Sequence, residues 1–170
     1  MKSSKFASFI FLILLLYGCS LGRTLNQADV ENFLAQQNID PSKIVQTDYH
    51  SYYYIFYETN QQIGIYVLKG YEKGKYMYSH STTTDLRNVF VGGTENQSFG
   101  MVIMNEDLLD QAAYIDVLFP KTGETERFNL VKGQKEYVIE SELITLPFDY
   151  EIKFYSQEGE RLYTFGSRPN

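Results

Sequence analysis

The stretch SYYYIFYETNQQIGIYVLKG, residues 51–70, holds two runs of aromatic and β-branched residues on either side of a polar Thr-Asn-Gln-Gln segment. Runs of this composition favour β-strands, and a short polar segment between two of them is typical of a turn. The first run extends back to Ile44, and a second turn at Gly70–Gly74 leads into a third run at Lys75–Ser81. The sequence therefore predicts a three-stranded antiparallel meander.

A short helix is predicted before this meander. Its apolar residues have the i, i+3, i+4 spacing of an amphipathic helix: Val30, Phe33 and Leu34. Asn26 is a typical N-cap residue, and the Asp40-Pro41 pair ends the pattern. We expect a helix at about 27–37 that covers one face of the meander, so that residues 27–84 form a small α+β part.

The rest of the chain predicts a second part that is rich in strands. Residues 82–95 are polar and contain Gly92-Gly93, which indicates a linker, with room for a brief strand at Val89–Val91. Six strand-like runs follow: Phe99–Met104, Ala113–Phe119, Thr125–Leu130, Glu136–Ile139, Tyr150–Tyr155 and Arg161–Phe165. Glu106–Gln111 is expected to form a single helical turn. Short strands with regular turns are typical of a β-sandwich, which we expect over 96–170, so the fold class is mostly β.

Three segments of this second part carry a family resemblance. They are the strand Phe99–Ile103, the strand Ile115–Phe119, and the closing Ile152–Tyr155 followed by Glu158-Gly159. Together they resemble the immunoglobulin-like module at the C-terminus of many small, uncharacterised lipoproteins of Firmicutes. The resemblance implies an immunoglobulin-like β-sandwich and a Gram-positive origin, and it brings no catalytic residues with it.

The N-terminus has the features of an export signal. Lys2 and Lys5 supply positive charge, and Phe6–Tyr17 is apolar apart from two small residues. A membrane-spanning helix needs about 20 apolar residues, so this shorter run is typical of a signal peptide. The run closes on Leu16-Tyr17-Gly18-Cys19, in which a small residue precedes the cysteine.

These four residues resemble the lipobox of bacterial lipoproteins. The resemblance implies that residues 1–18 are a signal peptide and that Cys19 receives a diacylglyceryl group, with a further acyl chain such as palmitate on the new amine. Residues 19–26 then form a lipidated tether, and the body lies on the extracytoplasmic side of the cell membrane. Two acyl chains anchor a protein durably, because each buried methylene contributes about 0.8 kcal/mol. A secreted protein with a chance cysteine and an uncleaved anchor helix are the alternatives.

Cysteine content and charge exclude several classes of function. Cys19 is the single cysteine, so the body has no internal disulfide and no thiol for catalysis. Without the two signal lysines, 13 Lys and Arg residues stand against 21 Asp and Glu, a net charge of −8. This balance disfavours binding to nucleic acid and electrostatic adhesion to anionic lipid. The covalent lipid is therefore the expected membrane contact.

The sequence contains no recognisable catalytic or cofactor motif. The patterns G-x-S-x-G, H-E-x-x-H and S-x-x-K are all absent. His50 and His80 are the only histidines, and no third ligand stands at a fixed spacing, so we expect no metal site. Glu106, Asp107 and Asp110 fit an acidic turn better than a pair of catalytic carboxylates. We therefore expect a protein that is not an enzyme and has no cofactor.

Tyrosine is the most unusual feature of the composition, with 15 Tyr and 12 Phe but no Trp. On a strand over 49–57, Tyr52 and Tyr54 share a face with His50 and Glu58, because side chains alternate between faces. The other face carries Tyr49, Tyr53 and Tyr57. We expect Tyr52 and Tyr54 to be the more exposed pair and to form a recognition face. The alternative is that the tyrosines pack against the helix and the second part.

The sequence thus predicts a membrane-anchored lipoprotein that acts as a non-enzymatic binding or interaction module, with a protein or glycan partner in the cell envelope. The alternatives are a cell-envelope enzyme of unrecognised type and an inhibitor or immunity-like protein. A concave site with several titratable groups of shifted pKa favours the enzyme. A contiguous exposed apolar patch favours a binding or inhibitory protein.

Overall fold

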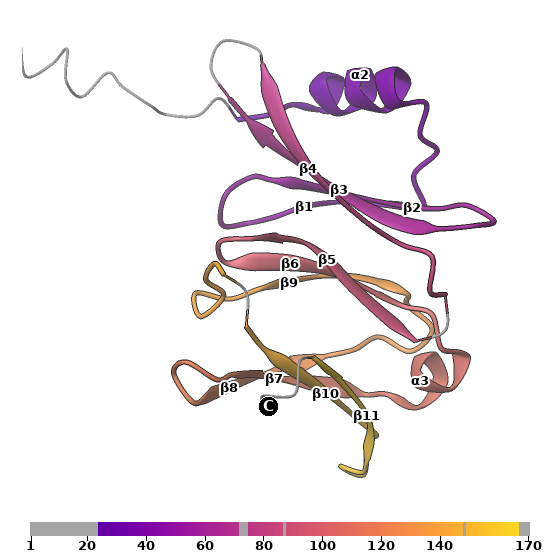
Figure 1. Cartoon of the computed structure of the whole chain (residues 1–170), viewed down its shortest axis with the longest axis vertical. Coiled ribbons are helices and arrows are strands. Elements are labelled where there is room, and N and C mark those ends of the chain that lie inside the picture. Colours follow the sequence, from indigo (N-terminus) through magenta and orange to yellow (C-terminus); the bar gives the residue numbers. More distant parts are fainter. Residues whose placement is uncertain (1–23, 72–74, 87, 148, 167–170) are drawn as a thin grey trace, which may run out of the picture.

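Three antiparallel sheets and two helices make up the described residues, 24–71, 75–86, 88–147 and 149–166, in a computed structural model of the chain. Figure 1 shows them as stacked layers, with helix α2 on the first sheet, the first sheet on the middle sheet, and the middle sheet on the third. The fold is mostly β, as predicted, and consists of a helix followed by antiparallel sheets consistent with a β-sandwich.

The first layer is the helix α2 (Gln27–Gln37), which has the predicted bounds. A capping box begins it, because the Asn26 side chain accepts a hydrogen bond from the Asp29 amide and the Asp29 carboxylate accepts one from the Asn26 amide. Leu25 precedes the cap and packs in the same apolar cluster as Val30, in the manner of a hydrophobic staple. The folded body therefore includes Leu25, which the predicted tether over 19–26 had placed outside it.

The first sheet has one strand more than the predicted meander. Its order is β1 (Lys43–Gln46), β2 (Tyr53–Glu58), β3 (Ile63–Gly70) and β4 (Tyr76–Thr83). The expected long run from Ile44 to Tyr57 is divided by a turn, in which the Thr47 amide donates to the Tyr52 carbonyl at 2.9 Å and Ser51 has a φ of 53°. Lys43–Gln46 consequently folds back and pairs with β2.

All six strands predicted for the second part are present, and β5 adds a seventh. The middle sheet has the order β5 (Val89–Glu95), β6 (Ser98–Ile103) and β9 (Glu136–Glu140). The third sheet has the order β11 (Arg161–Gly166), β10 (Glu151–Tyr155), β7 (Tyr114–Phe119) and β8 (Glu124–Asn129). Helix α3 (Glu106–Gln111) connects β6 to β7, where a helical turn was predicted. Two facing antiparallel sheets with crossing connections are the architecture of immunoglobulin-like sandwiches.

The predicted linker over 82–95 is wrong for most of its length, because β4 continues to Thr83 and β5 begins at Val89. The glycines there serve close packing between sheets. A Cβ atom on Gly92 would lie 2.6 Å from the Ser81 Cβ, and one on Gly93 would lie 2.7 Å from a methyl of Val67. Gly93 also has a φ of +61°, a conformation that favours glycine. The sandwich therefore starts at Val89 and not at residue 96.

The middle sheet is covered on both faces, and this joins the two predicted parts into one stack. All six residues of β6 are buried, and its apolar side chains are divided between two apolar clusters. Phe99, Met101 and Ile103 face the third sheet, while Val102 packs against the first sheet. A part-buried ion pair adds a polar link between layers, since Lys69 of β3 contacts Glu95 of β5.

Candidate functional site

The predicted recognition face of Tyr52 and Tyr54 is wrong. Tyr54 has no exposed surface, and its hydroxyl donates to the Gly93 carbonyl at 2.8 Å and lies 2.9 Å from the Ser98 hydroxyl. Tyr52 is half-buried on the same face, with the Lys69 ammonium 5.4 Å from its ring centre. The middle sheet covers this face of β2. The alternative expectation, that these tyrosines pack against the second part of the chain, is therefore the correct one for Tyr52 and Tyr54.

The opposite face of the first sheet carries an aromatic group that helix α2 covers only in part. Tyr66 of β3 lies opposite His80 of β4, and their rings stack with centres 3.9 Å apart and planes 3° apart. Tyr57 of β2 lies beside both, with ring centres 5.6 Å from Tyr66 and 5.8 Å from His80. We refer to Tyr57, Tyr66 and His80 as the Tyr–His stack.

Gly64 makes room for this arrangement. It pairs with Tyr57 across β2 and β3, and a Cβ atom at Gly64 would lie 2.3 Å from the Tyr57 ring. The Tyr57 ring therefore lies across the backbone of the neighbouring strand. A side chain at residue 64 would displace it.

Hydrogen bonds orient the stack. The Gln62 amide lies 3.4 Å from the Tyr57 hydroxyl oxygen and donates to it, and that hydroxyl lies 2.8 Å from His80 Nε2. Burial lowers the pKa of His80 and raises the pKa of Tyr57, so a neutral imidazole and a protonated phenol are favoured. The Tyr57 hydroxyl and His80 Nε2 therefore share a hydrogen bond between two neutral groups, and the imidazole tautomer sets which of them donates.

A pocket of about 380 Å³ opens beside the Tyr–His stack, between the end of α2 and the β2–β3 turn. We call it the α2–hairpin pocket. Its lining residues are Gln37, Asn38, Ile39, Asp40, Tyr57, Glu58, Thr59, Gln62, Tyr66 and His80. The walls thus combine three aromatic rings with amides, a hydroxyl and two carboxylates. Concave sites with aromatic walls and a few polar groups are typical of small-ligand binding.

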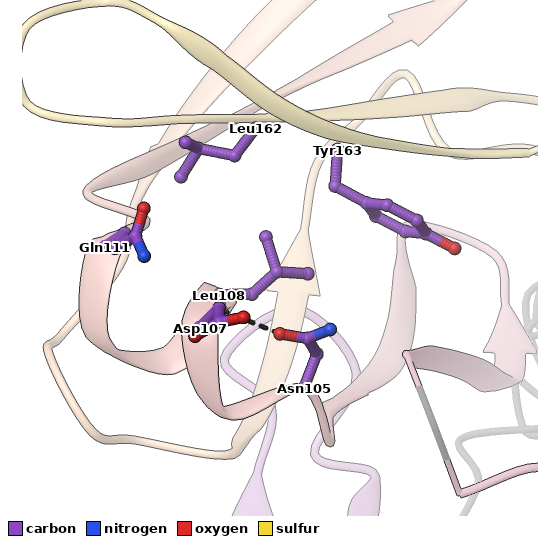
Figure 2. Close-up of a pocket in the computed structure, with 6 residues that line it drawn as sticks. All are labelled: Asn105, Asp107, Leu108, Gln111, Leu162 and Tyr163. Atoms are coloured by element: carbon purple, nitrogen blue, oxygen red, sulfur yellow. Dashed lines mark hydrogen bonds between the residues drawn. The ribbon is translucent and has the colours of Figure 1, made fainter.

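A second hollow of about 270 Å³ lies between α3 and β11. Figure 2 shows Leu108 and Leu162 pointing toward it from the helix and the strand, with Asn105 and Gln111 near its rim. The Asn105 side chain accepts a hydrogen bond from the Leu108 amide at 3.1 Å, so it caps the helix. This hollow has an apolar base and lacks the aromatic stack and hydrogen-bond chain of the α2–hairpin pocket, which we therefore take as the candidate site.

The remaining predicted residues are spread over the molecule. His50 lies in the exposed turn before β2 and stacks on Tyr52, whereas His80 belongs to the Tyr–His stack on the opposite face of the sheet. Within the described ranges, no group of three or more His, Cys, Asp and Glu residues is placed to hold a metal ion. Glu106 and Asp107 are in the first turn of α3.

Cys19, the predicted lipidation site, lies outside the described residues, as does the signal peptide over 1–18. In the described part of the chain, neither helix combines the length and the hydropathy that crossing a bilayer requires.

Comparison with known proteins finds no match: no family model, no curated protein and no solved structure is similar to this chain. The site must therefore be understood from its own residues.

Sequence reasoning missed the Tyr–His stack, although a signal was present. Pairing β2 with β3 and β3 with β4 around the two predicted turns places Tyr57 opposite Gly64 and Tyr66 opposite His80. A glycine opposite a tyrosine indicates a ring that lies across the neighbouring strand. Strand pairing does not predict where helix α2 lies, and it is this helix that turns the surface into a pocket.

Proposed function

We propose that this protein is a membrane-anchored lipoprotein whose extracytoplasmic body binds a small ligand in the α2–hairpin pocket and does not transform it. The observation that carries the proposal is the pocket itself, in which the Tyr–His stack forms one wall and polar side chains form the others. Rigid aromatic walls with a few oriented polar groups give both contact area and specificity.

The composition of the pocket supports binding over catalysis. Its ten described lining residues include no Cys, Ser or Lys, and the hydroxyl of Thr59 is engaged in the β2–β3 turn, where it accepts hydrogen bonds from the backbone amides of Gln61 and Gln62. His80 Nε2 is engaged by the Tyr57 hydroxyl, and Tyr66 covers one face of the imidazole. The histidine is therefore held in place as part of a wall.

The proposed anchor places the pocket near the membrane. Leu25 is already part of the apolar core under α2, so only five residues lie between it and Cys19. An extended chain spans at most about 3.5 Å per residue, so Leu25 lies within roughly 20 Å of the lipidated residue and α2, which begins at Gln27, within roughly 30 Å. A ligand of the membrane-adjacent layer would reach the pocket directly.

The anchor is tested by mass spectrometry of protein extracted from membranes. We expect an N-terminal peptide that begins at Cys19 and carries a diacylglyceryl group. The Cys19→Ala variant should remain unprocessed and unlipidated, with the fold of residues 24–170 unchanged. An intact Met1 on the mature wild-type protein would contradict the lipoprotein proposal.

The pocket is tested by ligand-observed NMR on the full chain in detergent, with the low-molecular-weight fraction of a cell-envelope extract. Thr59 is exposed on the pocket wall, so Thr59→Trp should fill the cavity and abolish saturation transfer. Gln111→Trp, at the second hollow, is the matched control and should retain the signal. Equal signals from both variants, or none from the wild type, would contradict ligand binding at this site.

A further inference from the structure

The electrostatics of the α2–hairpin pocket narrow the class of ligand. Asp40 and Glu58 are exposed carboxylates in its wall, and no Lys or Arg is among its described lining residues. The nearest ion pair joins Glu58 to Lys135 at 3.9 Å, with both side chains about half-exposed. Such a surface pair is weak and screened by salt, so it leaves the pocket acidic.

The end of helix α2 adds to this negative potential. Gln37 is the last residue of the helix and Asn38 is its C-cap, and both line the pocket. The C-terminal end of a helix carries about half a negative charge, which a basic residue in the last turn commonly offsets. The last turn of α2 contains no basic residue. A cation in the pocket would take the place of that missing charge.

The aromatic wall favours the same sign of charge. Tyr57, Tyr66 and His80 present π systems, and the faces of tyrosine rings attract cations. Anionic ligands would meet two carboxylates and a helix C-terminus, and Lys135 offsets only one of these through its weak surface pair with Glu58. A neutral ligand could donate hydrogen bonds to the carboxylates but would leave the negative potential of the pocket without a balancing charge.

From these three features we infer that the α2–hairpin pocket binds a small organic cation with an ammonium group, whose charge lies between Asp40, Glu58 and the end of α2 and whose carbon atoms pack on the Tyr–His stack. The inference rests on the proposed binding function and specifies its ligand. The volume of about 380 Å³ suits a small molecule, since pockets of about 300 Å³ and more enclose such ligands.

The test uses the detergent-solubilised full chain and isothermal titration with probes of defined charge. Choline and putrescine represent small ammonium ions, and an N-acetyl-lysine amide represents the same group on a peptide. Glucose is the neutral probe and inorganic phosphate is the anionic one. We expect the small ammonium probes to bind, with an affinity that falls as salt is raised, because the attraction is electrostatic. Glucose and phosphate should not bind measurably.

Charge-neutralising variants locate the site. Asp40→Asn and Glu58→Gln keep the size of exposed side chains, so folding should be unaffected, which circular dichroism will check. Losing one charged partner should weaken ammonium binding by about tenfold or more. Asp107→Asn, in the second hollow, removes one charge from the molecule without touching the pocket and should leave the affinity unchanged.

The outcomes separate the two proposals. One contrary outcome is that glucose or phosphate binds at the pocket, with binding that Thr59→Trp blocks and Glu58→Gln does not change. That result would overturn the proposal of a cationic ligand and would still support the proposed binding function. Tighter binding of the lysine amide than of the small amines would overturn the small-molecule assignment in favour of a basic peptide. Absence of binding by every probe and by the envelope extract would overturn both.

Discussion

The hydroxyl of Tyr54 in β2 donates a hydrogen bond to the carbonyl of Gly93 in β5 at 2.8 Å, and so joins the first sheet to the middle sheet. The same oxygen lies 2.9 Å from the Ser98 hydroxyl of β6. Burial raises the pKa of Tyr54, which keeps the hydroxyl protonated and able to donate. A residue that strand alternation assigned to the surface is therefore a structural contact between layers.

Replacing Tyr54 by Phe should lower the free energy of unfolding by about 1–2 kcal/mol. The change removes the donor to Gly93 and leaves a buried carbonyl without this partner. Tyr78→Phe is the control, because Tyr78 is half exposed and its hydroxyl is expected to contribute less than about 0.5 kcal/mol. Urea denaturation measures both, and equal stabilities of the two variants would refute the inter-sheet role.

Gly64→Ala should destabilise the protein by roughly 1–3 kcal/mol and abolish ligand binding, because the new methyl group overlaps the Tyr57 ring. Tyr57→Ala removes that overlap. The Gly64→Ala change should therefore cost much less in a Tyr57→Ala background than in the wild type. A double-mutant cycle measures this difference, and additive effects of the two changes would show that the Tyr57 ring does not lie across Gly64.

His80 should make the protein less stable at mildly acidic pH. Its pKa is lowered by burial against Tyr57 and Tyr66, so between its folded pKa and the ordinary value near 6.5 the unfolded chain binds more protons than the folded one. The stability that neutral His80 contributes is fully present above the ordinary pKa and is lost as the pH falls from that value through the folded pKa. His80→Gln should flatten this part of the stability profile, whereas His50→Gln, in the turn before β2 and outside the Tyr–His stack, should leave it in place. The difference in free energy of unfolding between variant and wild type, measured across pH, removes the contributions of all other titrating groups. Parallel stability profiles for the wild type and His80→Gln would contradict the role of His80.

The sandwich should not be stable when residues 88–170 are produced alone. The middle sheet would then expose the apolar side chains that face the first sheet: Phe90, Val102, Met104 and Val138. We expect the fragment to bind a hydrophobic dye and to self-associate, and Val102→Thr with Val138→Thr should reduce both. Proteolysis within residues 84–88 should leave the two halves of the full chain associated. A monodisperse fragment that unfolds at the same midpoint as the full chain would instead support two separate domains.

Several features of this protein were predictable because their causes are local. The bounds of α2 follow from the cap at Asn26 and from the spacing of Val30 and Phe33, which are close neighbours in the chain. The strands of the third sheet follow from turns and from side-chain alternation, as in β7, where Ile115, Val117 and Phe119 are buried. The net charge and the single cysteine are likewise properties of the sequence itself.

Only the tertiary structure decided which faces are covered. Tyr54 and Gly92-Gly93 resemble surface and linker residues in the sequence, yet they are contacts between two sheets because the middle sheet is packed on both sides. The run Phe99–Ile103 of β6, which has no polar side chain, indicates burial on both faces but does not say which sheet lies on each. The α2–hairpin pocket likewise depends on where a helix end meets a hairpin turn and the edge strand β4, segments that are distant in the chain. Local sequence patterns determined the helices and strands. Their arrangement was determined by burial of the apolar faces that remained exposed on each element, because such a face is buried only by packing against another, distant segment of the chain.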